Sequence, residues 1–130
     1  MIVGIGTDLV EIARIRSALA RFGDRFARKV LVPREYQRFA AHRNPAAYLA
    51  KRFAAKEALS KALGTGMRHP VSWHQIGVVN HPSGQPYFEL SAALAAFLRE
   101  RGIRTAHVSL TDERDLAAAF VVLEGGADGT

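Results

Sequence analysis

The sequence predicts an α+β fold: a single compact domain in which a small, mostly antiparallel sheet packs against a long central helix. Two patterns support this class. Residues 46–63 are rich in alanine and are followed by Gly64 and Gly66, which predicts one long helix ended by glycines. Residues 105–111 alternate between apolar and polar side chains, which indicates a strand with one buried face. The 130 residues show no repeat or linker and are the size of one domain.

The N-terminal half is predicted to contain one strand and three shorter helical segments. Residues 2–7 are β-rich and include two glycines, which predicts a strand that another backbone approaches closely. Residues 10–22 carry apolar side chains at helical spacing. Residues 24–29 are expected to form a short helical turn. A further helix is expected over residues 33–42, because proline is tolerated in the first turn of a helix.

The C-terminal half is predicted to be richer in strands. Residues 73–80 and 87–90 are expected to pair as a hairpin through a turn rich in glycine and proline. Ser91 is the expected N-cap of a helix that runs to Arg101. Residues 117–123 are apolar throughout, which predicts a strand buried on both faces.

The expected domain boundaries follow from the end of this last strand. We expect one domain over residues 1–124, followed by a flexible tail over residues 125–130 that is rich in glycine.

Composition narrows the class of protein. The net charge is +6, from 18 basic and 12 acidic residues, so the chain attracts polyanions such as nucleic acid, phosphorylated cofactors or an acidic protein. Without cysteine, disulfides and thiolate metal sites are excluded. No segment approaches the ~20 apolar residues of a spanning helix. We therefore expect a cytoplasmic protein with no membrane contact.

Asp8 follows the first predicted strand and precedes a predicted helix. The favoured interpretation is a helix N-cap, a role that Thr7 could also take. The alternative is a carboxylate of a metal or phosphate site, and both roles can hold at once.

Glu57 and Lys61 lie one helical turn apart in the long helix. An ordinary surface ion pair would stabilise an exposed helix by only ~0.3–0.5 kcal/mol. However, Phe53 lies on the same side, and an exposed pair has no need of a neighbouring aromatic ring. This arrangement favours a functional site.

Several common motifs are excluded. Gly4-Ile5-Gly6 resembles the start of a dinucleotide-binding fingerprint, but Leu9 stands where a third glycine is required. The five histidines lack zinc-ligand spacing. No serine has the context of a catalytic triad.

Basic residues concentrate between Glu11 and Lys29, where six basic side chains accompany two acidic ones. Four of them, Arg14, Arg21, Arg25 and Arg28, form one helical face if the register continues past Gly23, and that face is either simply solvated or docks an acidic helix. Nucleic acid is less favoured because no aromatic residues are interleaved for stacking. The candidate docking residues are Arg14, Arg21 and Arg25.

Three stretches together resemble holo-[acyl-carrier-protein] synthases, the short single-domain type of 4′-phosphopantetheinyl transferase. Their order and spacing match the family, and the similarity runs through Glu124. The stretches are Gly4-Ile5-Gly6-Thr7-Asp8-Leu9-Val10-Glu11-Ile12, Arg52-Phe53-Ala54-Ala55-Lys56-Glu57-Ala58 and Lys61-Ala62-Leu63-Gly64-Thr65-Gly66.

This resemblance implies an activity. The family transfers 4′-phosphopantetheine from coenzyme A to a serine of an acyl carrier protein in fatty acid biosynthesis, and adenosine 3′,5′-bisphosphate leaves. The resemblance also implies a homotrimer with its site between neighbours. It makes Asp8 and Glu57 the Mg²⁺ ligands, with Glu57 also the base and Lys61 the partner of the departing phosphate.

The resemblance also implies a coenzyme A site. The matching residues are Arg52, Lys56, Ser60, Gly64 and Thr65, with Gly84, Gln85 and Pro86 near the adenine. Larger relatives carry a third carboxylate at the position of Val10. Some members have a histidine against the 3′-phosphate at the position of Asp112, and Arg114 is a possible substitute here.

The alternative function is a non-catalytic basic module that binds an acidic carrier protein or nucleic acid. A carboxylate pair with no role in catalysis would favour this alternative.

Overall fold

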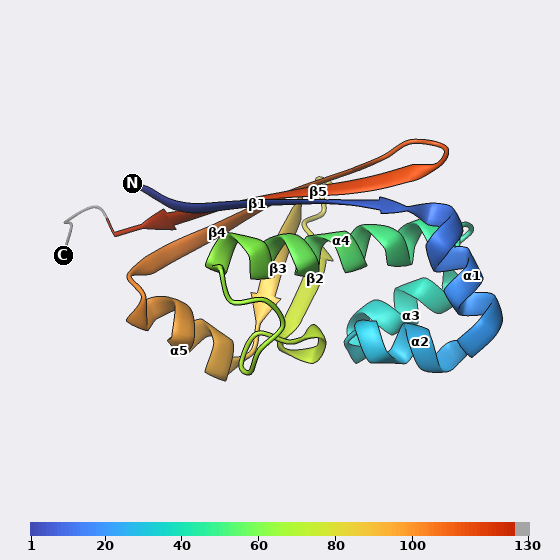
Figure 1. The fold of residues 1–130 in the computed structure, drawn as a ribbon, viewed down its shortest axis with the longest axis horizontal. Coiled ribbons are helices and arrows are strands. Elements are labelled where there is room, and N and C mark those ends of the chain that lie inside the picture. The colour runs from blue at the N-terminus through green and yellow to red at the C-terminus, as the bar shows by residue number, and fades with distance from the viewer. Residues whose placement is uncertain (127–130) are drawn as a thin grey trace.

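The computed structural model describes residues 1–126 and contains a three-stranded antiparallel sheet laid over one long helix (Figure 1). The strand order is β1-β5-β4. One face of this sheet packs against α4, which runs beneath β1 in Figure 1. The four elements are β1 (Ile2–Glu11), α4 (Pro45–Leu63), β4 (Ile103–Asp112) and β5 (Leu116–Gly125).

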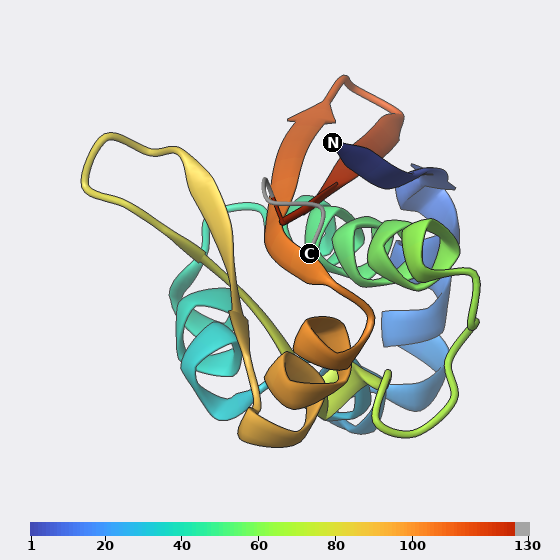
Figure 2. The ribbon, with the colours of Figure 1, turned by 90° about the vertical axis from the view of Figure 1, so that its left-hand side faces the viewer.

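The remaining elements cover the two ends and the lower side of α4. Helices α1, α2 and α3 gather at one end, while α5 and a two-stranded hairpin lie toward the other (Figure 1). The loop of the hairpin projects away from the body (Figure 2). Their bounds are α1 (Ile12–Phe22), α2 (Asp24–Val30), α3 (Pro33–Ala41), the 3-10 turn η1 (Trp73–Gln75), β2 (Ile76–Asn80), β3 (Pro86–Leu90) and α5 (Ala92–Glu100).

The predicted fold class is confirmed, as are the long helix and the hairpin. The side chain of Asn44 caps α4 by accepting a hydrogen bond from the Ala47 amide at 3.3 Å. Gly64 ends the helix in the left-handed conformation, with φ 74°, which glycine adopts readily. Ser91 caps α5, as predicted, because its hydroxyl accepts from the Leu94 amide at 3.1 Å.

β1 and α4 approach each other more closely than side chains would permit. A Cβ atom placed on Gly6 would lie 2.1 Å from the Ala58 carbonyl oxygen, and one on Gly4 would lie 2.4 Å from that of Ala62. The predicted close approach of another backbone is therefore confirmed. Gly4, Gly6 and Asp8 alternate along β1, so Asp8 faces the same helix.

The predicted capping role of Asp8 is wrong. β1 continues to Glu11, so Asp8 lies inside the strand, paired in register with Ala119. Glu11 occupies the N-cap position of α1 and makes no side-chain capping bond. The strand extends past residue 7 because β5 supplies hydrogen-bonding partners along its whole length.

The prediction that residues 117–123 are buried on both faces is also wrong. In β5 the buried residues alternate with less buried ones, and Phe120 is 49% exposed. Phe120 shares its outward face with Leu9 and Ile5 of β1, which are 65% and 61% exposed. We call this surface, formed by Ile5, Leu9, Leu116 and Phe120, the apolar sheet strip.

The C-terminal end departs slightly from the expected tail. Gly125 is the last residue of β5 and donates to the Met1 carbonyl at 2.7 Å, while Gly126 donates to Gly102 at 3.2 Å. The rest of the predicted tail, residues 127–130, lies outside the described residues. Within residues 1–126, no helix is both long enough and apolar enough to span a membrane.

Replacing Gly6 with alanine should destabilise the protein by at least ~1–3 kcal/mol, because the new methyl group meets helix backbone that cannot move aside. Urea unfolding followed by circular dichroism measures this free energy. Thr105→Ala, at an exposed position of β4, is the control and should stay within about 0.5 kcal/mol of wild type. Equal stability of Gly6→Ala and the control would contradict the close contact.

Candidate active site

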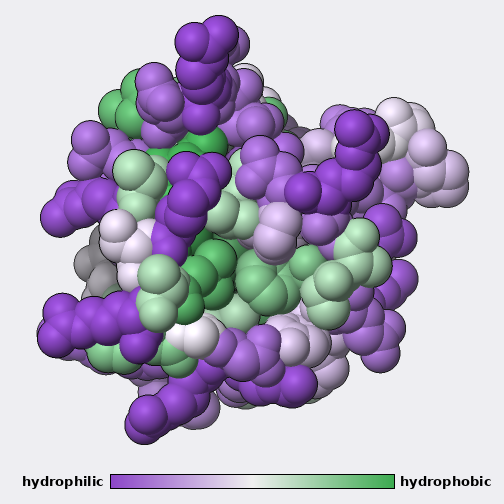
Figure 3. All heavy atoms as spheres, turned by 90° about the vertical axis from the view of Figure 1, so that its right-hand side faces the viewer, coloured by the Kyte–Doolittle hydropathy of each residue, from purple (hydrophilic) through white to green (hydrophobic). Residues whose placement is uncertain are grey.

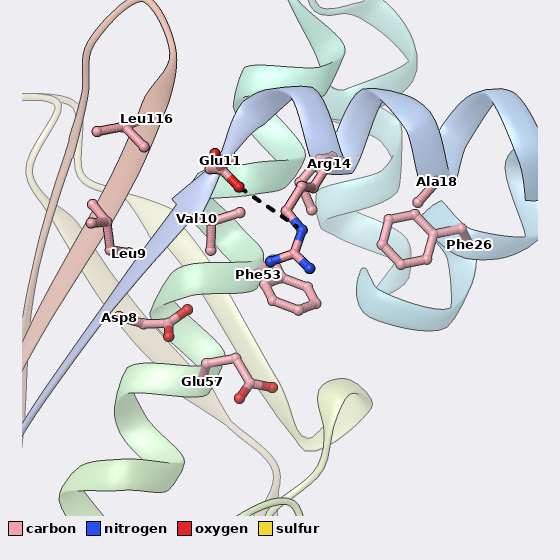
Figure 4. A pocket seen from close by; sticks show the side chains of 11 residues that line it. Asp8, Leu9, Val10, Glu11, Arg14, Ala18, Phe26, Phe53, Glu57 and Leu116 are labelled. Carbon is pink, nitrogen blue, oxygen red and sulfur yellow. Dashed lines mark ion pairs between the residues drawn. The ribbon is translucent and has the colours of Figure 1, made fainter.

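The carboxylates of Asp8 and Glu57 face one open pocket of about 440 Å³ between β1, α1, α2 and α4 (Figure 4). Asp8 comes from the sheet and Glu57 from the helix beneath it. The other walls are largely apolar: Val10, Ile15, Ala18, Phe26, Phe53 and Leu116. The pocket therefore offers the Asp8 and Glu57 carboxylates beside a largely apolar surface, and Glu11 and Arg14 also belong to its lining.

Lys61 pairs with Asp8 and not with its helix neighbour. Its Nζ donates to Asp8 Oδ1 at 2.8 Å and lies 3.4 Å from the Thr7 carbonyl oxygen. Among the ion pairs of residues 1–126, Glu57 and Lys61 do not form the local pair considered from the sequence. The lysine thus links the long helix to the first strand at the pocket.

The electrostatics of the pocket reflect two negative charges held close together. Burial raises the pKa of Glu57, and the charge of Asp8 raises it further, while Lys61 partly opposes this. The hydrogen bond to Asp8 raises the pKa of Lys61, so its ammonium form is favoured.

These donors fit a hard divalent cation. Mg²⁺ prefers carboxylate oxygens and keeps several waters, so two carboxylates beside an open cavity suit it. Burial is the main cause of the raised pKa of Glu57, and the charge of Asp8 adds to it; a bound cation would offset both effects. Residues 1–126 contain no cluster of three or more histidine, aspartate or glutamate side chains that could enclose a metal ion.

Lys56 points away from this pocket into the core and is fully buried. Its Nζ donates to Glu35 Oε1 and to the Val30 carbonyl, each at 2.6 Å, and to the Trp73 carbonyl at 3.1 Å. All three of its protons are used, so Lys56 is not open to a ligand here. The resemblance placed Lys56 with the coenzyme-binding residues; its buried partner Glu35 lies 21 residues away along the chain and left no local signal.

Arg52 also lies on the far side of α4. Arg52 stands five positions before Glu57, so the two side chains point about 140° apart around the helix axis. Its guanidinium donates to Asn80 Oδ1 at 2.6 Å and stacks 4.1 Å from the ring of Tyr48. Ser60 is buried, and its hydroxyl donates to the Glu57 carbonyl at 2.7 Å.

The remaining residues predicted to bind coenzyme A lie in two different parts of the structure. Gly64 and Thr65 border a cavity at the end of α4, together with Arg68, His69, Phe97 and Arg101. Gly84, Gln85 and Pro86 belong to the projecting hairpin (Figure 2). The structure therefore brings Asp8, Glu57 and Lys61 together but leaves the hairpin residues on another side of the chain.

The predicted basic face is interrupted at Gly23. This residue has φ 63° and separates α1 from α2, so the two helices do not share one register. The Arg14 side chain borders the pocket and its Nε lies 4.0 Å from a Glu11 carboxylate oxygen, whereas Arg21 and Arg25 are exposed and do not line the pocket. Hydrophobic surface also gathers at the centre of this end of the molecule, surrounded by hydrophilic side chains (Figure 3).

Two contacts near the site were missed from the sequence. The Phe53 ring stacks on Trp73 at 5.1 Å, which braces one wall of the pocket. Lys51 Nζ lies 3.2 Å from Asp112 Oδ1, so this carboxylate is paired with a cation of α4. The separation between Lys51 and Asp112 along the chain left no local signal for this pair.

Comparison with known proteins defines the class of this fold and pocket. Residues 4–121 match the model of the 4′-phosphopantetheinyl transferase superfamily, so the class is that of a phosphopantetheinyl transferase. The chain is 54% identical over 127 residues to the holo-[acyl-carrier-protein] synthase of Thiobacillus denitrificans, covering 98% of this chain and 97% of that protein. The chain belongs to the holo-[acyl-carrier-protein] synthase family.

Solved structures agree with this assignment. The holo-[acyl-carrier-protein] synthase of Neisseria meningitidis superposes with a TM-score of 0.92 at 47% identity, covering 95% of this chain and 99% of that one. The enzyme of Bacillus anthracis, in complex with CoA (3′,5′-ADP), gives 0.82 at 35% identity, covering 97% and 99%.

Asp8→Asn should lower the pKa of Glu57 in metal-free protein, because it removes the nearby negative charge that raises that pKa and releases Lys61. A carbon-13 NMR titration of the Glu57 carboxyl measures the change. Asp24→Asn, at an exposed position of α2, is the control and should leave Glu57 unaffected. An unchanged pKa in Asp8→Asn would show that the two carboxylates do not interact.

Proposed function

We propose that this protein transfers 4′-phosphopantetheine from coenzyme A to a serine hydroxyl of an apo acyl carrier protein. The product is holo acyl carrier protein, as used in fatty acid biosynthesis, and adenosine 3′,5′-bisphosphate leaves. The observation that carries this proposal is the carboxylate pair, Asp8 and Glu57, in a pocket with Lys61 alongside. Membership of the holo-[acyl-carrier-protein] synthase family supports the substrates.

Asp8 and Glu57 are the residues that would hold Mg²⁺. When bound, the cation would supply charge neutralisation for the diphosphate of coenzyme A. Lys61 would provide a second positive charge on the same side, where it can stabilise the phosphate that departs. Its raised pKa keeps it protonated for this role.

The reaction exchanges one phosphorus–oxygen bond for another. The serine oxygen bonds to the phosphorus that carries pantetheine, and the bond from that phosphorus to the bridging oxygen breaks. The bridging electrons leave with adenosine 3′,5′-bisphosphate. Glu57, acting through a water molecule, takes the serine proton as general base.

The active assembly is proposed to be a homotrimer with each site shared between neighbours. The candidate coenzyme residues support this sharing, because Glu57 and Arg52 point about 140° apart on α4 and the hairpin projects away from the pocket. The apolar sheet strip supports an oligomer, since Leu9 and Phe120 are large and exposed. The number three comes from the family resemblance.

An acidic carrier protein would dock over α1 and the start of α2. Arg14 supplies positive charge at the pocket, Arg21 and Arg25 are exposed on α1 and α2, and Phe26 supplies apolar surface on the pocket wall. Charge of this kind chiefly speeds and orients encounter. Docking here would bring the carrier's serine beside Glu57. A cytoplasmic location stays a prediction.

The first test mixes this protein with apo acyl carrier protein, coenzyme A and Mg²⁺ and measures the intact mass of the carrier. We expect a gain of one phosphopantetheine. Glu57→Gln should slow the gain by at least about 100-fold, because the substitution removes both a base and a charge. Glu100→Gln, at the exposed end of α5, is the control.

No mass gain with wild-type protein would overturn the proposed function and favour a non-catalytic binding module. A wild-type rate in Glu57→Gln would instead overturn the role of that residue alone.

The second test asks whether one site uses two chains. Glu57→Gln and Arg52→Gln should each be nearly inactive alone. When the two are unfolded, mixed equally and refolded, about a quarter of the sites should regain both intact halves, if subunits associate at random in a closed ring. The transfer rate and the oligomer mass by light scattering measure this recovery. An active monomer, or no recovery in mixed oligomers, would contradict a shared site.

A further inference from the structure

Lys56 and Glu35 form an ion pair that is fully buried between α3 and α4, with Nζ 2.6 Å from Oε1. Neither side chain lines the pocket of the carboxylate pair. Glu35 Oε1 also accepts a hydrogen bond from the Val32 amide at 2.9 Å, and its Oε2 accepts from the Val78 amide at 2.7 Å. Both charges are therefore satisfied inside the protein, and the pair itself is closed to substrates.

The lysine of this pair also connects α4 to two segments beyond α3. Lys56 Nζ donates to the carbonyl of Val30, the last residue of α2, at 2.6 Å and to that of Trp73, the first residue of η1, at 3.1 Å. The two segments contact each other as well, since His74 Nε2 lies 2.7 Å from the Arg28 carbonyl oxygen. Helix α2 and η1 are therefore linked to each other, and Lys56 links both of them to α4.

These linked segments shape the apolar wall of the open pocket. Phe26 of α2 stands one helical turn before Val30 and lines the pocket together with Phe53 of α4 (Figure 4). The Phe53 ring stacks on the ring of Trp73, with the centroids 5.1 Å apart. A shift of α2 and η1 relative to α4 would therefore change the apolar surface beside Glu57.

Stability alone does not require two charges at this position. A buried ion pair can often be replaced by apolar residues of similar volume without loss of stability, because taking both charges out of water costs about as much as their attraction returns. What the charges add is direction. The ammonium group of Lys56 has three donors, and here they fix the positions of three acceptors on three different elements.

We propose that Lys56 is a positioning residue that holds the pocket wall of Phe26 and Phe53 in the shape that receives the acyl carrier protein. It acts through the carbonyl groups of Val30 and Trp73 and touches neither the carrier nor coenzyme A. This inference rests on the proposed function, because the carrier is the proposed occupant of that wall. Removing the ion pair should therefore weaken use of the carrier and leave use of coenzyme A unchanged.

Steady-state kinetics of the double variant Lys56→Met/Glu35→Gln test this role, because the variant leaves no unpaired buried charge. We expect KM for the carrier to rise about tenfold, the size of losing one good interface contact, and KM for coenzyme A to stay within about twofold of wild type. Arg34→Met/Glu89→Gln, which removes an exposed ion pair of α3, is the matched control and should change neither KM.

The two KM values separate positioning from a general loss of structure. Fewer folded molecules would lower kcat and leave both KM values unchanged, and that result would overturn the proposal. An equal rise of both KM values would also overturn it, because Lys56 would then serve the coenzyme. Trp73→Leu keeps the ion pair but removes the ring that braces Phe53, so it should raise KM for the carrier as well. A wild-type KM for the carrier in this variant would contradict the proposed route.

Trp73 is the only tryptophan of the chain, so its fluorescence reports on this wall without any transfer reaction. Acrylamide should quench it more readily in Lys56→Met/Glu35→Gln than in wild type or the control. Titration with apo carrier should show an affinity about tenfold weaker in that variant. Unchanged carrier affinity would overturn the proposal whatever the quenching. If the affinity falls as expected but wild-type protein modifies no carrier, the positioning role stands and the proposed transfer fails.

Discussion

The whole arrangement depends on how closely β1 lies against α4. Two glycines, Gly4 and Gly6, allow the strand backbone to rest on the helix at Ala58 and Ala62, where any side chain would collide with carbonyl oxygens. The same alternation that turns these glycines inward turns Asp8 inward. The position of the Asp8 carboxylate is therefore set by backbone packing. That packing requires glycine at positions 4 and 6.

Helix α4 contributes side chains to two different surfaces of the protein. One side presents Glu57 and Lys61 to the open pocket, and the other presents Arg52 to the hairpin. Between them, Lys56 is locked to Glu35 inside the core. Since removing one member of a buried pair leaves an uncompensated charge, such pairs hold neighbouring elements in a fixed arrangement. Here the pair joins α3 to α4, and the Lys56 contact with Trp73 extends this support toward Phe53.

The fold could be predicted because its signals are local or periodic, whereas the pairing of Asp8 with Glu57 came from the resemblance to a known family. Alternation in residues 105–111 and the glycine end of α4 are examples. The errors came from contacts distant in sequence. β1 is longer than its composition suggests because β5 pairs with it. Lys61 prefers Asp8 to Glu57, and Lys56 finds Glu35, through contacts that only the assembled fold creates. The exposed face of β5 could not be recognised because its residues are apolar on both sides.

The contact between Lys61 and Asp8 has a consequence for how the protein matures. In a classical zinc finger the ligands repel or remain scattered until the metal arrives, so folding and metal binding are one event. Here an internal ammonium group already compensates one carboxylate at 2.8 Å. We therefore expect the chain to fold without the magnesium ion proposed above. Binding of the proposed ion would replace the Lys61 ammonium group beside Asp8 in a protein that is already folded. A chelator would then abolish activity without unfolding the protein.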